Sequence, residues 1–118
     1  MKAIRIQEKV KGVGFDWDEK TQVWDKVQEE LTELREAETS QNQAEIEAEF
    51  GDVLFALINY ARFIGVNPEN ALEKTNLKFK SRFTAMENFI HEEKKDIGNM
   101  KLEELDVYWN KAKTLERK

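Results

Sequence analysis

The stretch KVQEELTELREAE, residues 26–38, decides the fold and raises the question of function. Its valine and leucines recur at spacings of three and four, which is typical of the apolar face of an α-helix. The same stretch places three acids, Glu29, Glu30 and Glu33, within five residues. On a helical wheel Glu30 and Glu33 lie about 60° apart on one flank of that face, whereas Glu29 points further out. The acids belong either to a solvated helix face or to a metal site.

The helical period extends through most of the chain, and five glycines and one proline among 118 residues interrupt it rarely. The predicted helices cover residues 3–11, Asp18 or Thr21 to Glu38, Gln43 to Ile64, Pro68 to Glu92, and Leu102 to Leu115. Around GVNPEN, Gly65 can end a helix in the left-handed conformation, and Asn67 can cap the next helix before Pro68. The expected fold is an all-α antiparallel helical bundle.

Apolar stripes run along the three longest predicted helices. They comprise Val23, Trp24, Val27, Leu31 and Leu34; Ile46, Phe50, Val53, Leu54, Leu57 and Ile58; and Leu72, Phe79, Phe83, Met86 and Ile90. Three such stripes are easier to bury on so small a chain if two copies pair, so we expect a homodimer. Trp17 and Trp24 are expected to take part in packing.

Composition narrows the classes of function. The length fits a single domain over residues 1–118. A net charge of −5 argues against nucleic acid as the main partner. The sequence has no apolar run long enough to predict a membrane span. The absence of cysteine excludes disulfides and thiolate chemistry, which favours a cytoplasmic protein. There is no P-loop sequence and no Glu-x-x-His pair of the kind found in di-iron bundles.

A second acidic pair supports the metal hypothesis. Glu49 and Asp52 are again three residues apart on one flank of an apolar stripe. The fifteen residues between Glu33 and Glu49 leave room for a turn and an antiparallel return. Four carboxylates from two helices suit Mg²⁺ or Mn²⁺ rather than zinc. Gly51 costs about 1 kcal/mol relative to alanine inside a helix, and close approach of a neighbouring helix would offset this cost.

These acids carry a family resemblance. The sequences EELTE and EFGD, fifteen residues apart, match the EExxE…ExxD signature of the MazG family of nucleoside triphosphate pyrophosphohydrolases. The segments GVGFDWDEKTQVWDKVQEELTELREA, EAEFGDVLFALINYARFIGVNPENAL, KTNLKFKSRF and ELDVYWNKAK also resemble MazG segments, in the expected order. The resemblance covers nearly the whole chain and is strongest to the second domain of two-domain bacterial MazG proteins. FDWD replaces the PWD that is usual in the first domain. We therefore expect the chain to be one domain of a longer protein, with Met1 an added start.

The resemblance implies a paired all-α bundle that hydrolyses the α–β phosphate bond of nucleoside triphosphates with Mg²⁺. Nucleoside monophosphate and pyrophosphate are the implied products, and removal of noncanonical nucleotides is the implied role. Glu30, Glu33, Glu49 and Asp52 would be the metal ligands. Glu29 fills the first place of the motif, and its outward angle suits a role in orienting water.

Basic side chains that follow the acidic motif could bind the negatively charged phosphates of a triphosphate. Lys78 and Arg82 lie one turn apart, and the family uses a lysine and an arginine at these places to hold phosphates. Lys26 lies one turn before Glu30 and can reach the same pocket. A solvated basic face is the alternative for Lys78 and Arg82. Asn76 is a further candidate for nucleotide contact.

Trp109 and Lys113 repeat the spacing of four residues near the carboxyl end. A tryptophan at a pocket rim can stack on a nucleobase, and the resemblance favours this role for Trp109. Packing beside Leu105 and Ala112 is the competing interpretation. Two functions rival hydrolysis: a nucleotide-binding sensor or interaction domain with little turnover, and a structural bundle with solvated acids. The sequence does not decide which base or sugar is preferred.

Overall fold

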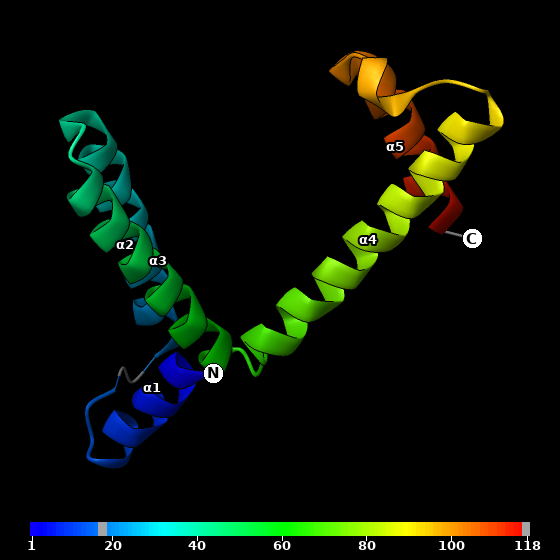
Figure 1. Ribbon diagram of the computed structural model, residues 1–118. Coiled ribbons are helices and arrows are strands. Elements are labelled where there is room, and N and C mark those ends of the chain that lie inside the picture. The colour runs from blue at the N-terminus through cyan, green and yellow to red at the C-terminus, as the bar shows by residue number, and fades with distance from the viewer. Residues whose placement is uncertain (17–18, 117–118) are drawn as a thin grey trace. The chain divides into compact units, whose positions relative to one another are not determined.

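The computed structural model describes residues 1–16 and 19–116, and every regular element in this part of the chain is helical. The elements are α1 (Lys2–Gly12), α2 (Lys20–Ser40), α3 (Gln43–Phe63), α4 (Pro68–Glu92), the 3-10 helix η1 (Ile97–Asn99) and α5 (Leu102–Glu116) (Figure 1). The all-α class is therefore confirmed, and the predicted helices end within a few residues of the observed ones. None of the described helices combines the length and the apolar character that crossing a membrane requires.

The first long helix begins with a cap that the sequence pattern did not identify. Glu19 is the N-cap of α2, and a capping box joins it to Gln22, whose side-chain oxygen accepts a hydrogen bond from the Glu19 backbone amide at 3.3 Å. Thr21 lies inside the helix, so the prediction that it caps α2 was wrong. The other predicted cap, Asp18, and the tryptophan before it, Trp17, lie outside the described residues.

The remaining turns follow local capping chemistry. Asn42 caps α3 by accepting hydrogen bonds from two backbone amides of the first turn. Gly65 has a φ of 73°, and the side chain of Asn67 accepts a hydrogen bond from the Asn70 amide at 3.0 Å just before α4 begins at Pro68. The predicted order of stop, cap and first helical residue is thus confirmed.

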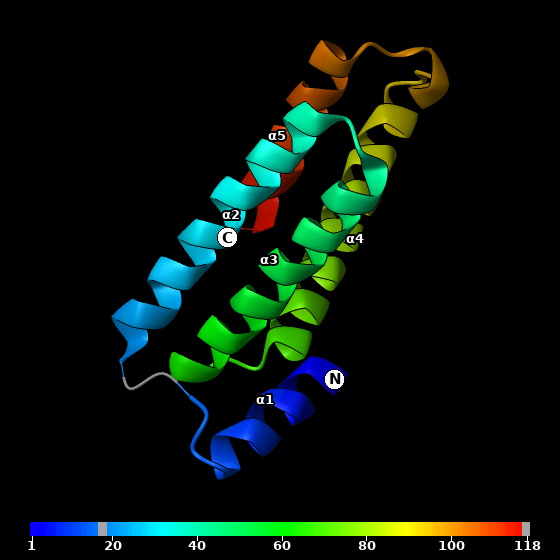
Figure 2. The same ribbon diagram turned by 90° about the vertical axis from the view of Figure 1, so that its left-hand side faces the viewer.

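The chain divides into two compact units, residues 1–71 and 72–118. In the first unit α2 and α3 pack side by side and run in opposite directions, and α1 packs against α3 (Figure 2). Val23 and Val27 of α2 are each 1% exposed and lie with Val53 and Ala56 of α3 among the core residues. Trp24 contacts Tyr60 across this pair of helices, with ring centroids 5.0 Å apart, as its predicted packing role requires.

The second unit has its own small core. Met86 and Ile90 of α4 pack against Tyr108 of α5, and partly buried residues surround this cluster: Phe89, Ile97, Met100, Leu105 and Trp109. Met86 and Ile90 therefore pack as the periodicity of α4 predicted, whereas Phe83 on the same stripe is exposed.

Several residues of the predicted apolar stripes are exposed in the single chain, and their burial by a second copy stays a prediction. They are Trp24, Leu31, Phe50, Leu54, Leu57, Leu72, Phe79 and Phe83. Periodicity identifies the apolar face of a helix, but burial also needs a second apolar surface to cover that face. A two-helix layer covers only one side of each helix, so part of every stripe remains open.

Candidate metal centre

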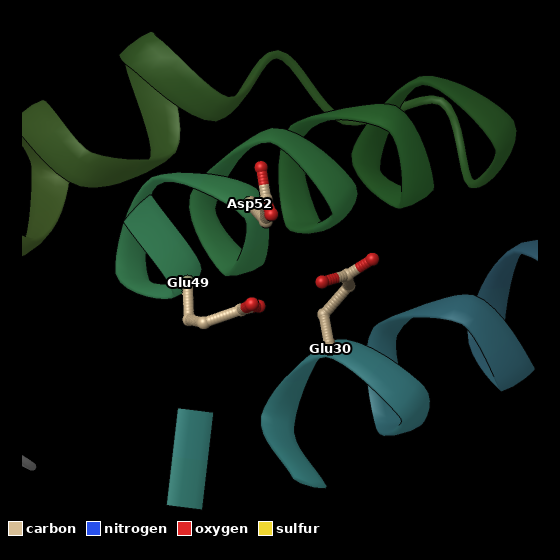
Figure 3. Close-up of side chains that lie close together, drawn as sticks. All are labelled: Glu30, Glu49 and Asp52. Carbon is tan, nitrogen blue, oxygen red and sulfur yellow. The ribbon is translucent and has the colours of Figure 1, made fainter. Parts of the chain in front are cut away.

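Three acidic side chains from two helices come together in the first unit. Glu30 projects from α2, and Glu49 and Asp52 project from α3 (Figure 3). Each offers one carboxylate oxygen, and these three oxygens lie within 4.8 Å of one another. The spacing of three residues puts Glu49 and Asp52 on one side of α3, and the antiparallel packing of α2 brings Glu30 opposite them. The sequence prediction that the two acidic flanks face each other is confirmed for these residues.

Two of the three acids are shielded from solvent in a way that fits a bound cation. Glu30 is 6% exposed and Glu49 is half-buried, whereas Asp52 is exposed. Among the described residues, Oε2 of Glu30 and Oε2 of Glu49 are buried and accept no hydrogen bond. Buried carboxylate oxygens without partners are costly, and a divalent cation removes that cost by direct coordination. A site made only of carboxylate oxygens suits Mg²⁺ or Mn²⁺.

Glu33 belongs to the edge of this centre. It is not one of the three residues with oxygens within 4.8 Å of one another. Its pKa is nevertheless raised from 4.5, first by the negative charge of Glu30, then by loss of hydration, a hydrogen bond with Glu30 and the charge of Glu49. The structure thus gathers three of the four predicted ligands and places the fourth within electrostatic reach of two of them.

Lys26 and Glu29 form the outer side of the centre. The Lys26 Nζ lies 3.0 Å from Oε1 of Glu30 and 3.5 Å from Oε1 of Glu29. The hydrogen bond with Glu30 is the main cause of a raised Lys26 pKa. Lys26 therefore pairs with one Glu30 oxygen and leaves the buried Oε2 unpaired. Glu29 is exposed, as its position on the helical wheel predicted.

Apart from Lys26, the candidate phosphate and base residues lie in the second unit. Asn76 and Lys78 are exposed on α4, whereas Arg82 and, on α5, Trp109 and Lys113 are half-buried. The roles predicted for all five toward the nucleotide stay predictions.

Trp109 has a clear packing role. Its ring centroid lies 5.0 Å from that of Phe79, and it packs against the core cluster around Met86 and Ile90. The packing interpretation of Trp109 is therefore confirmed, and stacking on a base would use the part of the ring that remains exposed.

Gly51 lies between the two α3 acids, and here the sequence interpretation was wrong for the single chain. A Cβ built on Gly51 would meet no atom of the described residues within 4 Å. Within the first unit, neither α1 nor α2 approaches closely enough to require a glycine. The cost of glycine in α3 is therefore not offset by packing inside that unit.

Sequence reasoning missed one group of polar residues near α1. Gln7 is buried, and Asp16 forms an ion pair with Arg62 of α3 at 2.9 Å. Neither the spacing nor the composition of residues 3–16 signals these contacts, because their partners are 46 and 48 residues away.

Comparison with known proteins agrees with the geometry. Residues 19–86, which include all the clustered acids, match the model of the MazG nucleotide pyrophosphohydrolase domain. The chain is 46% identical over 111 residues to the nucleoside triphosphate pyrophosphohydrolase/pyrophosphatase MazG of Thermotoga maritima, covering 94% of this chain and 42% of that protein. It is 37% identical over 118 residues to the nucleoside triphosphate pyrophosphohydrolase of Escherichia coli, covering 98% of this chain and 45% of that protein. The chain thus spans less than half the length of these relatives.

A shorter match is 49% identical over 73 residues to the uncharacterized protein YabN of Bacillus subtilis, covering 62% of this chain and 15% of that protein. The matched domain model extends over more than half of the chain and includes Glu30, Glu33, Glu49 and Asp52. The chain therefore belongs to the family of MazG nucleotide pyrophosphohydrolase domains.

Proposed function

We propose that the chain is a Mg²⁺-dependent nucleoside triphosphate pyrophosphohydrolase that takes part in removing unwanted nucleotides. The carboxylate centre of Glu30, Glu49 and Asp52, with its two buried unpaired oxygens, is the observation that carries this proposal. The family and the names of the relatives support the same reaction. Residues 1–118 form one MazG-type domain in this proposal, and the protein acts in the cytoplasm.

In the proposed reaction, the oxygen of a water molecule forms a bond to the α-phosphorus. The bond between that phosphorus and the oxygen bridging to the β-phosphorus breaks, and pyrophosphate leaves with the bridging oxygen. Glu30, Glu49 and Asp52, with Glu33 beside them, would hold Mg²⁺, or Mn²⁺ in its place. Such an ion lowers the pKa of bound water and offsets charge on the phosphates. A carboxylate of the cluster accepts the proton that the water loses, and Glu29 orients the water.

Positively charged residues complete the proposed site. Lys78 and Arg82 would hold the β and γ phosphates and balance the charge that builds on the leaving pyrophosphate. Lys113 and Asn76 would contact the nucleotide, and Trp109 would stack on the base. Lys26 has a different supporting role, because its ion pair with Glu30 holds one carboxylate oxygen and leaves the other for the ion.

We further propose that the protein works as a homodimer. The exposed apolar residues of α2 and α3, among them Leu31, Phe50 and Leu57, are the reason. Together they form the kind of uncovered apolar surface that usually marks an interface. A second copy of the chain offers the matching surface without any other partner.

The decisive experiment identifies the products. The protein is incubated with a panel of ribo- and deoxyribonucleoside triphosphates and Mg²⁺, and the phosphorus products are separated by ³¹P NMR. We expect monophosphate and pyrophosphate in equal amounts, and none in the presence of a chelator. Diphosphate with orthophosphate would contradict the proposed bond cleavage. Tight Mg²⁺-dependent binding without turnover would identify the rival sensor function.

A further inference from the structure

Lys26 places a positive charge directly beside the carboxylate centre, in which Glu30 faces Glu49 and Asp52 (Figure 3). Its Nζ lies 3.0 Å from Oε1 of Glu30 and 3.5 Å from Oε1 of Glu29. The other oxygen of Glu30, Oε2, is buried and accepts no hydrogen bond from the described residues. The two oxygens of one carboxylate therefore differ, because the ammonium group holds Oε1 and only Oε2 is left for an ion.

The stability of α2 does not explain this ion pair. Lys26 precedes Glu30 by four residues, and such a pair stabilises a helix less with the lysine first than with the glutamate first. The side chain of Lys26 is 40% exposed, so water screens its contribution to stability. Glu30 itself is buried, and the pair therefore acts mainly on the surroundings of its carboxylate.

Both partners of Lys26 belong to α2, so the pairing is set within one helix. Glu29 and Glu30 follow Lys26 by three and four residues, the two spacings that bring side chains together on a helix surface. Lys26 needs no contact with α3 to hold Oε1 of Glu30. This oxygen is consequently occupied before an ion binds.

The number of available carboxylate oxygens affects Mg²⁺ and Ca²⁺ differently. Mg²⁺ demands a nearly octahedral arrangement at short distances, and the two oxygens of one carboxylate are too close together to fill two corners of so small an octahedron. Ca²⁺ accepts about six to eight oxygens in a flexible arrangement and readily takes both oxygens of one carboxylate. An ion that uses both oxygens of Glu30 has to displace Lys26, whereas an ion that uses Oε2 alone does not.

We propose that Lys26 determines the metal specificity of the centre by holding Oε1 of Glu30, which keeps this carboxylate monodentate and disfavours Ca²⁺ relative to Mg²⁺. The inference rests on the proposed function and adds the residue that selects its ion. Lys26 acts through Glu30 and is therefore a positioning residue.

The test measures metal binding without catalysis and uses Mn²⁺ as the probe. Electron paramagnetic resonance detects free Mn²⁺, so titration with Mg²⁺ or Ca²⁺ gives the concentration of each ion that displaces half of the bound Mn²⁺. Lys26→Met removes the charge and the hydrogen bond but keeps a good helix former in α2. We expect this variant to lower the ratio of the Ca²⁺ to the Mg²⁺ concentration about tenfold, a typical effect of losing a residue that supports a metal ligand. Because both ions carry two charges, the loss of the lysine charge by itself cancels in the ratio.

Two variants are the controls. Lys26→Arg keeps a cation that can donate to Oε1 of Glu30, so it should retain the parental ratio within about twofold. Lys20→Met removes the same charge at an exposed position at the start of α2, and it should retain the parental ratio as well.

Infrared difference spectra report the binding mode of the carboxylates. The splitting between the two carboxylate stretches is smaller for a bidentate carboxylate than for a monodentate one. Ca²⁺ should therefore produce a stronger narrowly split pair of bands in Lys26→Met than in the parent. Adding Glu30→Gln to Lys26→Met should remove this difference, because Glu30 is the carboxylate that changes its mode.

The outcomes separate this inference from the proposed function. An unchanged ratio in Lys26→Met, or an equal fall in Lys20→Met, would overturn the role of Lys26 even if the parent releases pyrophosphate with Mg²⁺. A parent that binds no Mn²⁺ would overturn it as well. If the ratio falls only in Lys26→Met but the parent releases no pyrophosphate, metal selection by Lys26 stands and the proposed reaction is wrong.

Discussion

Glu49 illustrates how a single atom links burial to chemistry. Its buried, unpaired Oε2 lies in a group of acids that repel one another without a cation. We expect Glu49→Gln to lower kcat/KM by more than a hundredfold and to raise the melting temperature of the metal-free protein. Glu47→Gln, the same change at an exposed site on α3, should leave both near the parental values. If Glu49→Gln keeps more than a tenth of the activity, equivalent to about 1.4 kcal/mol, the metal assignment is wrong.

Glu33 predicts a pH dependence for the metal-free protein. Its pKa is raised above 4.5 in the folded state, chiefly by the charge of Glu30, so the folded state binds this proton more tightly than the unfolded state does. The resulting stabilisation is complete below pH 4.5 and is lost as the pH rises through the higher folded pKa. Urea unfolding in the presence of a chelator should show a steeper loss of stability over this window in the parent than in Glu33→Gln.

A matched variant and a metal titration check the Glu33 prediction. Glu36→Gln, at an exposed position one turn later, should keep the parental slope of stability against pH. Addition of Mg²⁺ should reverse the loss, because a cation favours the ionised carboxylates. An identical slope in the parent and in Glu33→Gln would show that its neighbours do not control the titration of Glu33.

At the scale of the elements, helix α3 carries a glycine that its surroundings do not require. Since a Cβ on Gly51 would meet no atom of the described chain within 4 Å, Gly51→Ala should raise the free energy of unfolding by up to about 1 kcal/mol. Gly65→Ala is the control with the opposite expected effect on stability, because the φ of 73° at Gly65 disfavours any side chain. It should lower stability by about 1–2 kcal/mol. Urea titrations measure both, and a loss in Gly51→Ala would place another chain against this face.

The ends of the helices could be predicted from the sequence because they depend on neighbouring residues. The burial of each helix could be predicted only in part because it depends on the surface that lies opposite. Gly65, Asn67 and Pro68 act on their immediate neighbours, so the start of α4 can be read from four residues. The burial of Phe50 depends on which surface lies opposite, and no local pattern contains that information. The cap at Glu19 was missed because glutamate is an uncommon N-cap, and its bond needs Gln22 three residues later.

For the whole molecule, the open apolar faces predict self-association. Light scattering coupled to size exclusion should give a dimer mass for the parent protein. Leu57→Glu puts a charge on the exposed face of α3 and should give a monomer with little activity. Leu102→Glu makes the same change at an exposed leucine at the start of α5 and should remain a dimer. A parent that is monomeric at high concentration, yet active, would exclude pairing.

The residues of the candidate site could be predicted where their contacts are close in sequence, and could not where the contacts are distant in sequence. Glu30, Glu49 and Asp52 were identified from repeated spacings of three and a short connection, because two antiparallel helices convert those spacings into one cluster. Gln7 and Arg62, which lie outside that cluster, escaped because each depends on a partner more than forty residues away. The spacing of polar residues along an amphipathic helix does not indicate which of them will be buried.

The short connection between α2 and α3 has a consequence for the order of folding. Pairing these helices closes only a small loop, and contacts that are local in sequence form quickly. The Gln7–Phe55 and Asp16–Arg62 bonds instead join residues 48 and 46 positions apart. Closing such loops costs more chain entropy, so we expect the α2–α3 hairpin to form first and the contacts of α1 and the loop after it with α3 to be completed late. In stopped-flow refolding, a core substitution such as Val27→Ala should then slow folding, whereas Gln7→Leu should change mainly the unfolding rate.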